Sequence, residues 1–265
     1  MGSDHVKKIA GVGHQDFETI RQRNYFYIDK THLIKEWWEN GDSVTLITRP
    51  RRFGKTLNMS MIETFFSVKY KDRKDLFEKL KIWEWEEFRK LQGTYPVIFI
   101  SFADVKETSF SQVRKKICSI IKDVYNRHVF LLEGNFLNEN EKQDFRNISV
   151  DMEDYKVSGS IRALSNHLSR YYGKKVIILL DEYDTPMQEA YVNGYWEELA
   201  SFTRSLFNST FKTNPYLERA IMTGITRVSK ESIFSDLNNL EVVTTTSKKY
   251  GDCFGFTEEE VFAAL

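Results

Sequence analysis

The apolar residues of the chain fall into short continuous runs, separated by longer segments in which they recur every three or four positions. The clearest run, Val176 to Leu180, has no polar interruption. Such runs are typical of parallel strands that are buried on both faces, and their alternation with helical segments predicts an α/β sheet. Strands are expected at 44–48, 97–102, 176–180, 219–224 and 241–246.

The intervening segments predict helices. In 55–68 the apolar residues Leu57, Met61 and Phe65 share one face. Thr31 is expected to cap the helix that follows it, and Thr257 begins a capping-box pattern. Charges in 69–90 are expected to form the solvated face of one or two surface helices. Other helices are expected at 16–23, 32–39, 110–132, 161–172 and 195–211.

A basic loop joins the first strand to the helix that begins at Lys55. Backbone amides of such a loop and of a helix N-terminus bind polyphosphate, a lysine there reaches the terminal phosphates, and the following hydroxyl can bind magnesium. We therefore expect Lys55 to act in catalysis and Thr56 to bind the metal. The residues expected to bind the nucleotide are Arg49, Pro50, Arg51, Arg52, Phe53, Gly54, Lys55, Thr56 and Leu57.

The loop departs from the strict GxxxxGK[ST] pattern at its first position, where Arg49 replaces glycine. Either the backbone at Arg49 avoids positive φ, or the loop is built differently. Taken alone, Gly54-Lys55-Thr56 could be a chance tripeptide at a helix start.

Two carboxylates directly follow the third apolar run. In phosphate-loop enzymes the first such acid holds magnesium and the second orients or deprotonates the attacking water. Asp181 is therefore expected at the metal and Glu182 in catalysis, the alternative being an ordinary solvated strand end. Asp184 either assists at the metal or caps the next helix, and we favour the cap. The basic loop and the acid pair are expected to face each other across adjacent strand ends.

Polar residues also follow the strand expected at 219–224. Ligands of open α/β sheets bind at the carboxyl ends of the strands, so Thr223 could contact the γ-phosphate or the water, and Arg227 could neutralise developing charge. Alternatively, Thr223 satisfies backbone groups and Arg227 pairs with a surface acid. The aromatic segment 25–31 is a candidate base pocket or simply packs on the sheet edge.

The charge, hydropathy and cysteine content of the chain limit the classes of partner and the cellular location that we expect. The 38 basic residues equal the 38 acidic residues, so net charge gives no support to nucleic-acid binding, although Arg49, Arg51 and Arg52 leave it open. No run reaches the roughly 18 apolar residues of a membrane span and no signal-peptide core is present, so we expect a cytoplasmic protein. Cys118 and Cys253 allow at most one disulfide and no metal set.

The pattern predicts three regions. Residues 1–43 form an N-terminal arm that packs on the core, 44–256 form the nucleotide-binding core with a helical insertion around 133–158, and 257–265 begin a truncated C-terminal domain.

These motifs together resemble the AAA-ATPase-like family, from about Gly13 to Val261. The residues that carry the resemblance are Tyr27-Ile28-Asp29-Lys30-Thr31, Arg49 to Thr56, Leu180-Asp181-Glu182-Tyr183-Asp184, Gly224-Ile225-Thr226-Arg227-Val228 and Asn238-Asn239-Leu240.

The resemblance implies a three-layer α/β/α P-loop NTPase fold, with a mainly parallel five-stranded sheet in the order 5-1-4-3-2. It also implies ATP binding by Gly54, Lys55 and Thr56, metal and water handling by Asp181 and Glu182, and a sensor role near Thr223. The absent first glycine is a habit of the family, whose members often carry a C-terminal PD-(D/E)XK nuclease-like domain. We expect a magnesium-dependent ATPase, or alternatively a nucleotide-gated switch with little hydrolysis.

Overall fold

The computed structural model describes residues 9–226, 233–234 and 237–264. The chain forms two compact units. The sheet unit contains Asp42–Pro50 and Tyr95–Ser247, and the helical unit contains Met1–Gly41, Arg51–Thr94 and Lys248–Leu265. Each unit is described by itself.

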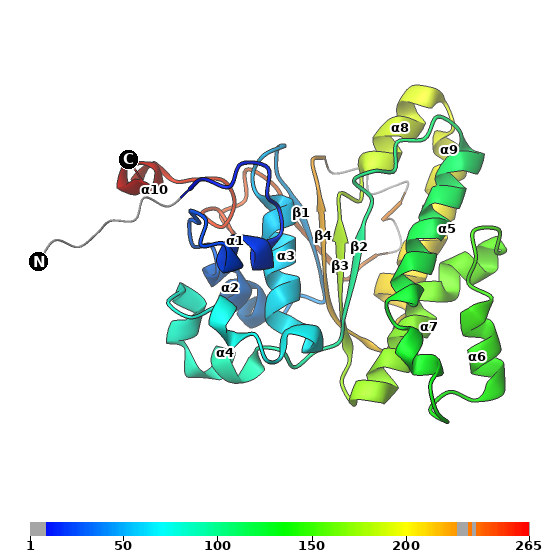
Figure 1. Cartoon of the computed structure of the whole chain (residues 1–265). Coiled ribbons are helices and arrows are strands. Elements are labelled where there is room, and N and C mark those ends of the chain that lie inside the picture. The colour runs from blue at the N-terminus through cyan, green and yellow to red at the C-terminus, as the bar shows by residue number, and fades with distance from the viewer. Residues whose placement is uncertain (1–8, 227–232, 235–236, 265) are drawn as a thin grey trace, which may run out of the picture. The chain divides into compact units, whose positions relative to one another are not determined.

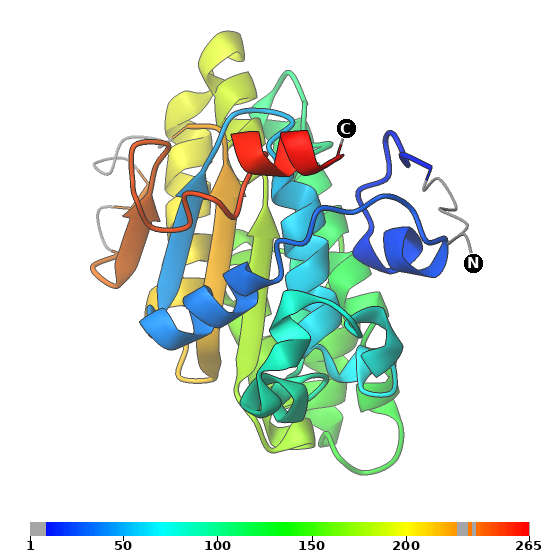
Figure 2. The ribbon, with the colours of Figure 1, turned by 90° about the vertical axis from the view of Figure 1, so that its left-hand side faces the viewer.

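The sheet unit contains five parallel strands in the order β2-β3-β4-β1-β5 (Figure 1). This order confirms the predicted α/β fold, because it is the expected 5-1-4-3-2 read from the other edge. In Figure 2, β5 lies at the sheet edge beside β1. The strands are β1 (Val44–Thr48), β2 (Val97–Ser101), β3 (Val176–Asp181), β4 (Leu217–Gly224) and β5 (Leu240–Val243).

The apolar runs account for these strands. Every residue of β1 and β3 is buried, as expected for central strands of a parallel sheet. β5 is shorter than predicted because the chain turns after Val243, where the Ser247 amide donates to the Thr244 carbonyl and the Thr244 amide donates to Ser247 Oγ.

Helices of the sheet unit lie on one side of its sheet, with the buried faces of α5, α7 and α9 in one apolar cluster with the strands (Figure 1). The helix predicted at 110–132 is interrupted after Asn126, and a short 3₁₀ helix follows at Val129–Leu132. The helix predicted from 161 already begins at Asp154. The helices are α5 (Phe110–Asn126), α6 (Glu139–Arg146), α7 (Asp154–Tyr172), α8 (Thr185–Asn193) and α9 (Trp196–Phe207), with a π-helical turn at Asn208–Lys212.

The helical unit has its own aromatic core. The Phe77 ring lies 5.1 Å from both the Phe17 and the Phe65 rings, and Trp37 is fully buried. The segment 69–90 is therefore more than a charged surface, since Phe77 comes from it; it folds as 3₁₀ turns followed by α4. The helices are α1 (Phe17–Gln22), α2 (His32–Asn40), α3 (Lys55–Phe66), α4 (Glu86–Leu91) and α10 (Glu258–Ala264), with 3₁₀ turns at Val68–Tyr70, Lys74–Leu76 and Lys81–Glu84.

The two predicted caps have different outcomes. Thr31 precedes α2, but its hydroxyl makes no capping bond; it donates to Asp29 Oδ1 at 2.6 Å and accepts from the Ile82 amide at 3.0 Å. Thr257 and Glu260 form the reciprocal bonds of a capping box at the start of α10, at 2.8 and 3.2 Å.

Within the described parts of the chain, no helix is both long enough and apolar enough to cross a membrane.

Candidate functional site

The carboxyl ends of β1, β3 and β4 lie along one edge of the sheet. The register pairs Thr48 of β1 with Gly224 of β4, and Leu180 of β3 with Met222 of β4. β4 therefore separates β1 from β3, which corrects the expectation of adjacent strand ends. With neighbouring strands about 4.8 Å apart, the ends of β1 and β3 are about 10 Å apart.

Thr223 connects the two predicted acids. Its fully buried hydroxyl donates to Asp181 Oδ1 and accepts from the Glu182 amide at 3.3 Å. Its carbonyl accepts from the Tyr183 amide at 2.9 Å. From the sequence, Thr223 was expected either to contact a ligand or to satisfy backbone groups. Its hydrogen bonds to Asp181 and Glu182 were not predicted, because they depend on the register of β3 with β4.

The backbone at Glu182 adopts a left-handed conformation, with φ of 51°. This region costs a non-glycine residue about 1–2 kcal/mol, so the surrounding contacts must hold it. The chain turns there from β3 into α8, and the half-buried Glu182 accepts through Oε2 from Thr185 Oγ1 at 3.2 Å. The carboxylate is thus held near the start of α8.

Asp184 joins the turn after β3 to the residues after β4. It stands at the N-cap position of α8 without making a capping bond, so the favoured interpretation as a cap is wrong. Its Oδ2 instead accepts from the amides of Ile225 and Thr226, at 3.0 and 2.9 Å, and from Thr226 Oγ1 at 3.0 Å. Arg227, expected here as a charge-neutralising residue, lies outside the described residues.

The first loop position does not require glycine. Arg49 is not among the residues with positive φ, which supports the first of the two alternatives. Its buried guanidinium donates through Nη1 to the carbonyls of Thr48 and Val243, at 3.0 and 3.5 Å. Its amide donates to the Gly224 carbonyl at 3.1 Å, so the beginning of the loop is fastened to β4.

The remainder of the loop belongs to the helical unit and leads into α3. Gly54 stands at the N-cap of α3 with φ of 75°, and Arg52 also has positive φ, at 66°. Residues 51–54 are exposed, whereas Lys55 is buried. The Phe53 carbonyl accepts from the Gly255 amide at 3.1 Å, so residues near 255 support the loop.

A cavity of about 200 Å³ lies beside the loop within the helical unit. Phe26 and Tyr27, from the candidate base segment, share it with Gly54. Tyr27 also packs on Phe17, with ring centroids 5.5 Å apart, so the segment both lines a cavity and packs on its neighbours. The lining consists of Gly11, His14, Ile20, Phe26, Tyr27, Ile28, Lys30, Arg52, Phe53, Gly54, Leu57, Asn58, Cys253, Gly255 and Phe256.

Comparison with models of known protein families identifies the family of this chain. A family model described as "Predicted AAA-ATPase" matches residues 11–234, which include the basic loop, the acid pair and Thr223. The chain belongs to this AAA-ATPase-like family. The match confirms the resemblance carried by these motifs.

One relative of this AAA-ATPase-like chain is a protein from Azotobacter chroococcum mcd 1, described as an uncharacterized protein in the vnfD 5' region. The two are 26% identical over 264 residues, which is 98% of this chain and 45% of that protein. The chain therefore spans less than half the length of this relative.

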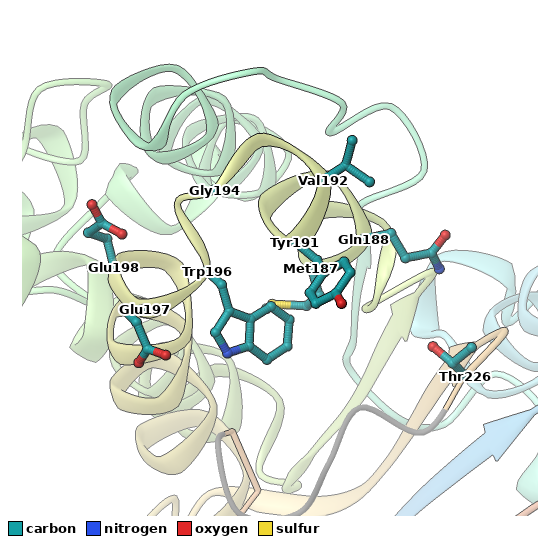
Figure 3. Close-up of a pocket in the computed structure, with 9 residues that line it drawn as sticks. All are labelled: Met187, Gln188, Tyr191, Val192, Gly194, Trp196, Glu197, Glu198 and Thr226. Carbon is teal, nitrogen blue, oxygen red and sulfur yellow. The ribbon is translucent and has the colours of Figure 1, made fainter.

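The sheet unit of the AAA-ATPase-like chain also contains a larger cavity, of about 690 Å³, which the sequence did not indicate. Figure 3 shows Trp196 beside Met187 and Tyr191, with Thr226 at the opposite side of the cavity from Glu198. Tyr191 is 79% exposed, so an aromatic side chain is available at the surface. The complete lining is Met187, Gln188, Tyr191, Val192, Gly194, Trp196, Glu197, Glu198 and Thr226.

Proposed function

We propose that the chain is a magnesium-dependent ATP-binding module that hydrolyses ATP. The observation that carries the proposal is the buried hydrogen-bond network of Asp181, Glu182 and Thr223, at the sheet edge where Arg49 and Pro50 begin the basic loop. Membership of the AAA-ATPase-like family supports nucleotide binding. Magnesium dependence and ATP hydrolysis go beyond what family membership supports, and we propose them from the residues of the sheet edge and the loop.

The loop supplies the phosphate-binding groups in this proposal. The exposed backbone of residues 51–54 precedes α3, and the first amides of a helix attract anions because they have no partner within the helix. Lys55 binds the β- and γ-phosphates. Arg49 acts by holding the beginning of the loop: its guanidinium donates to the Thr48 and Val243 carbonyls, and its backbone amide donates to Gly224 of β4.

Asp181 and Thr56 would hold the magnesium ion. The donor types fit, because Mg²⁺ prefers the hard oxygen atoms of carboxylates and hydroxyls. When bound, the ion neutralises phosphate charge. Thr223 orients Asp181 through its hydrogen bond, which fixes one carboxylate oxygen before a nucleotide arrives.

Glu182 orients the attacking water. The strained backbone at this residue supports a functional role, because strained residues cluster at active sites and switch regions. Arg227 stays a predicted neutraliser of charge in the transition state. The base occupies the 200 Å³ cavity, which is smaller than the roughly 300 Å³ lower bound of ordinary ligand pockets and therefore suits only part of a nucleotide.

Two variants test the proposal. Lys55→Ala should weaken ATP binding about 10- to 100-fold, because a charge-assisted contact contributes about 1.5–3 kcal/mol. Glu182→Gln should preserve binding and lower the rate of phosphate release at least about 100-fold, because a positioned base contributes about that much. Isothermal titration with ATP and magnesium measures binding, and a phosphate-release assay measures turnover.

Matched variants control for general effects. The exposed residues Lys90 and Glu133 are the sites for a second Lys→Ala and a second Glu→Gln change, each of which should leave both measurements unchanged. If Glu182→Gln hydrolyses ATP at the wild-type rate, the assigned role of this carboxylate is wrong. If Lys55→Ala binds ATP as tightly as the wild type, the nucleotide-binding role of the loop is wrong.

A nucleotide-gated switch with little hydrolysis is the second candidate. It is favoured by the position of α8, which begins at Thr185, three residues after Glu182, and carries the exposed Tyr191 beside the 690 Å³ cavity. Nucleotide binding could thus alter a surface that a C-terminal domain or partner recognises. ATP binding and altered hydrogen exchange in α8, without phosphate release in the presence or absence of DNA, would favour the switch.

A further inference from the structure

Four metal-binding side chains meet in the helical unit, outside the proposed nucleotide site. His32 and Glu36 are four residues apart on α2, which places them on the same face of the helix. Asp252 and Cys253 come from the segment before α10. One possible ligand atom from each of the four residues lies within 4.8 Å of the others.

The distances suit a small cation. His32 Nε2 lies 3.5 Å from Asp252 Oδ1, and Cys253 Sγ lies 3.7 Å from Asp252 Oδ1 and 3.9 Å from Glu36 Oε2. In a tetrahedral zinc site, with bonds of about 2.0–2.3 Å, ligand atoms are about 3.3–3.8 Å apart. The three pairs just given are already close to that spacing, and the widest pair, within 4.8 Å, would close by up to about 1 Å on metal binding.

The polar atoms of His32 give an independent reason to expect a ligand. The residue is only 9% exposed, its Nδ1 has no hydrogen-bond partner among the described residues, and its Nε2 faces the Asp252 carboxylate only at 3.5 Å. Leaving such a group unsatisfied costs about 1–3 kcal/mol. A metal ion bound to one of these nitrogens would remove part of that cost.

Lys30, the cation that contacts this cluster among the described residues, does not neutralise it. Lys30 Nζ donates to the Asp252 backbone carbonyl at 2.6 Å, but its ion pair is with Glu260, also at 2.6 Å. The side-chain carboxylates of Glu36 and Asp252 therefore remain as negative charges beside the thiol. Such a mixture of nitrogen, sulfur and oxygen donors is the set that zinc accepts.

We propose that His32, Glu36, Asp252 and Cys253 form a site for a divalent transition-metal ion, with Zn²⁺ as the ion that their donor atoms fit best. Cys253 binds as a thiolate and releases its proton to solvent. The ion fastens the segment 248–256 to α2, across more than 200 residues of sequence. The cysteine count alone indicated no metal set, because it could not include the histidine and the carboxylates.

Cobalt provides a direct test that needs no nucleotide. The whole chain, treated with a chelator and dialysed, is titrated with Co²⁺ and then with Zn²⁺. We expect one equivalent of Co²⁺ to produce thiolate-to-cobalt charge-transfer absorption in the near ultraviolet, and Zn²⁺ to abolish it. Cys253→Ser should lose this absorption, whereas Cys118→Ser, which changes the buried cysteine of the sheet unit, should retain it.

Two further variants keep the test decisive if Cys253→Ser does not fold. Glu36 and Asp252 are partly or fully exposed, so Glu36→Gln and Asp252→Asn should fold, and each should weaken Co²⁺ binding at least about tenfold. No charge-transfer band at stoichiometric Co²⁺, a band that persists in Cys253→Ser, or unchanged affinity in both carboxylate variants would overturn the proposal. Because nucleotide is absent, failure here would leave the proposed ATPase function untouched.

Discussion

Asp184 gives the sharpest stability prediction, because one buried carboxylate oxygen holds the chain after β4. The side chain is fully buried, and its Oδ2 accepts from the Ile225 amide, the Thr226 amide and hydroxyl, and the Gln188 side-chain amide. Replacement by alanine removes all of these bonds together. Replacement by asparagine retains one acceptor oxygen of similar shape.

The expected loss of stability in Asp184→Ala depends on whether each donor that loses its bond to Asp184 can bind water instead. The half-buried Ile225 loses the partner of its amide, at about 1–3 kcal/mol, whereas the donors of the exposed Thr226 and the half-buried Gln188 can bind water, which limits their combined loss to about 1 kcal/mol. Asp184→Ala should therefore lower the free energy of unfolding of the sheet unit by about 2–4 kcal/mol. Asp184→Asn should lower it by about 1 kcal/mol, since it preserves an acceptor and removes a buried charge.

Hydrogen exchange of peptides that cover β4 measures this locally, together with urea unfolding followed by circular dichroism. In Asp184→Ala, exchange at 217–226 should accelerate strongly relative to the wild type. Asp123→Ala, at an exposed position of α5, is the control and should change stability by less than about 0.5 kcal/mol. Equal stability of Asp184→Ala and Asp184→Asn would refute the assigned role of the carboxylate.

Two other predictions concern the sheet unit. In urea unfolding, Gly224→Ala should destabilise this unit by about 1–3 kcal/mol, because a new Cβ would lie 2.6 Å from the Tyr183 ring. Gly159→Ala should instead stabilise it by about 0.5–1 kcal/mol, because this glycine lies within α7 with open space around the added Cβ. Burial lowers the pKa values of His128 and His167, so the unfolded chain binds protons that the folded chain does not. Stability should therefore fall as pH decreases below about 6.5, and a double His→Gln variant should show a weaker fall between pH 7 and 5. An unchanged pH dependence in that variant would contradict the assignment.

Much of the fold could be predicted because burial in a parallel sheet leaves continuous apolar runs. β1 and β3 were placed to within one residue for this reason. The strand order came from the family resemblance, since periodicity does not determine which strands are neighbours. The start of α7 was missed because Ser158, Gly159 and Ser160 interrupt the apolar pattern, yet Val157 is fully buried and the helix is stabilised by that packing.

Part of the candidate site could likewise be predicted from the sequence, and part could not. The acid pair was predictable because it directly follows a strand, and the basic loop because it lies between a strand and a helix. The partners of Thr223 and Asp184 were not predictable, since they depend on the register between β3 and β4. The spacing of His32 and Glu36 was a visible signal, but the other two ligands come from more than 200 residues away. How the loop and the acid pair face each other stays a prediction.

The end of β4 is the structural connection between the two chemical elements of the sheet edge. The Gly224 carbonyl accepts from the Arg49 amide at the beginning of the loop, and Tyr183, immediately after the acid pair, lies so close to Gly224 that an added Cβ would be 2.6 Å from its ring. Thr223, one residue earlier, hydrogen-bonds Asp181. A displacement of β4 would therefore disturb both the start of the loop and the acid pair. The loop or the acid pair could move by itself only if its contacts with β4 were broken. It follows that substitutions at the end of β4 should impair binding and turnover together, unlike Glu182→Gln, which should separate them.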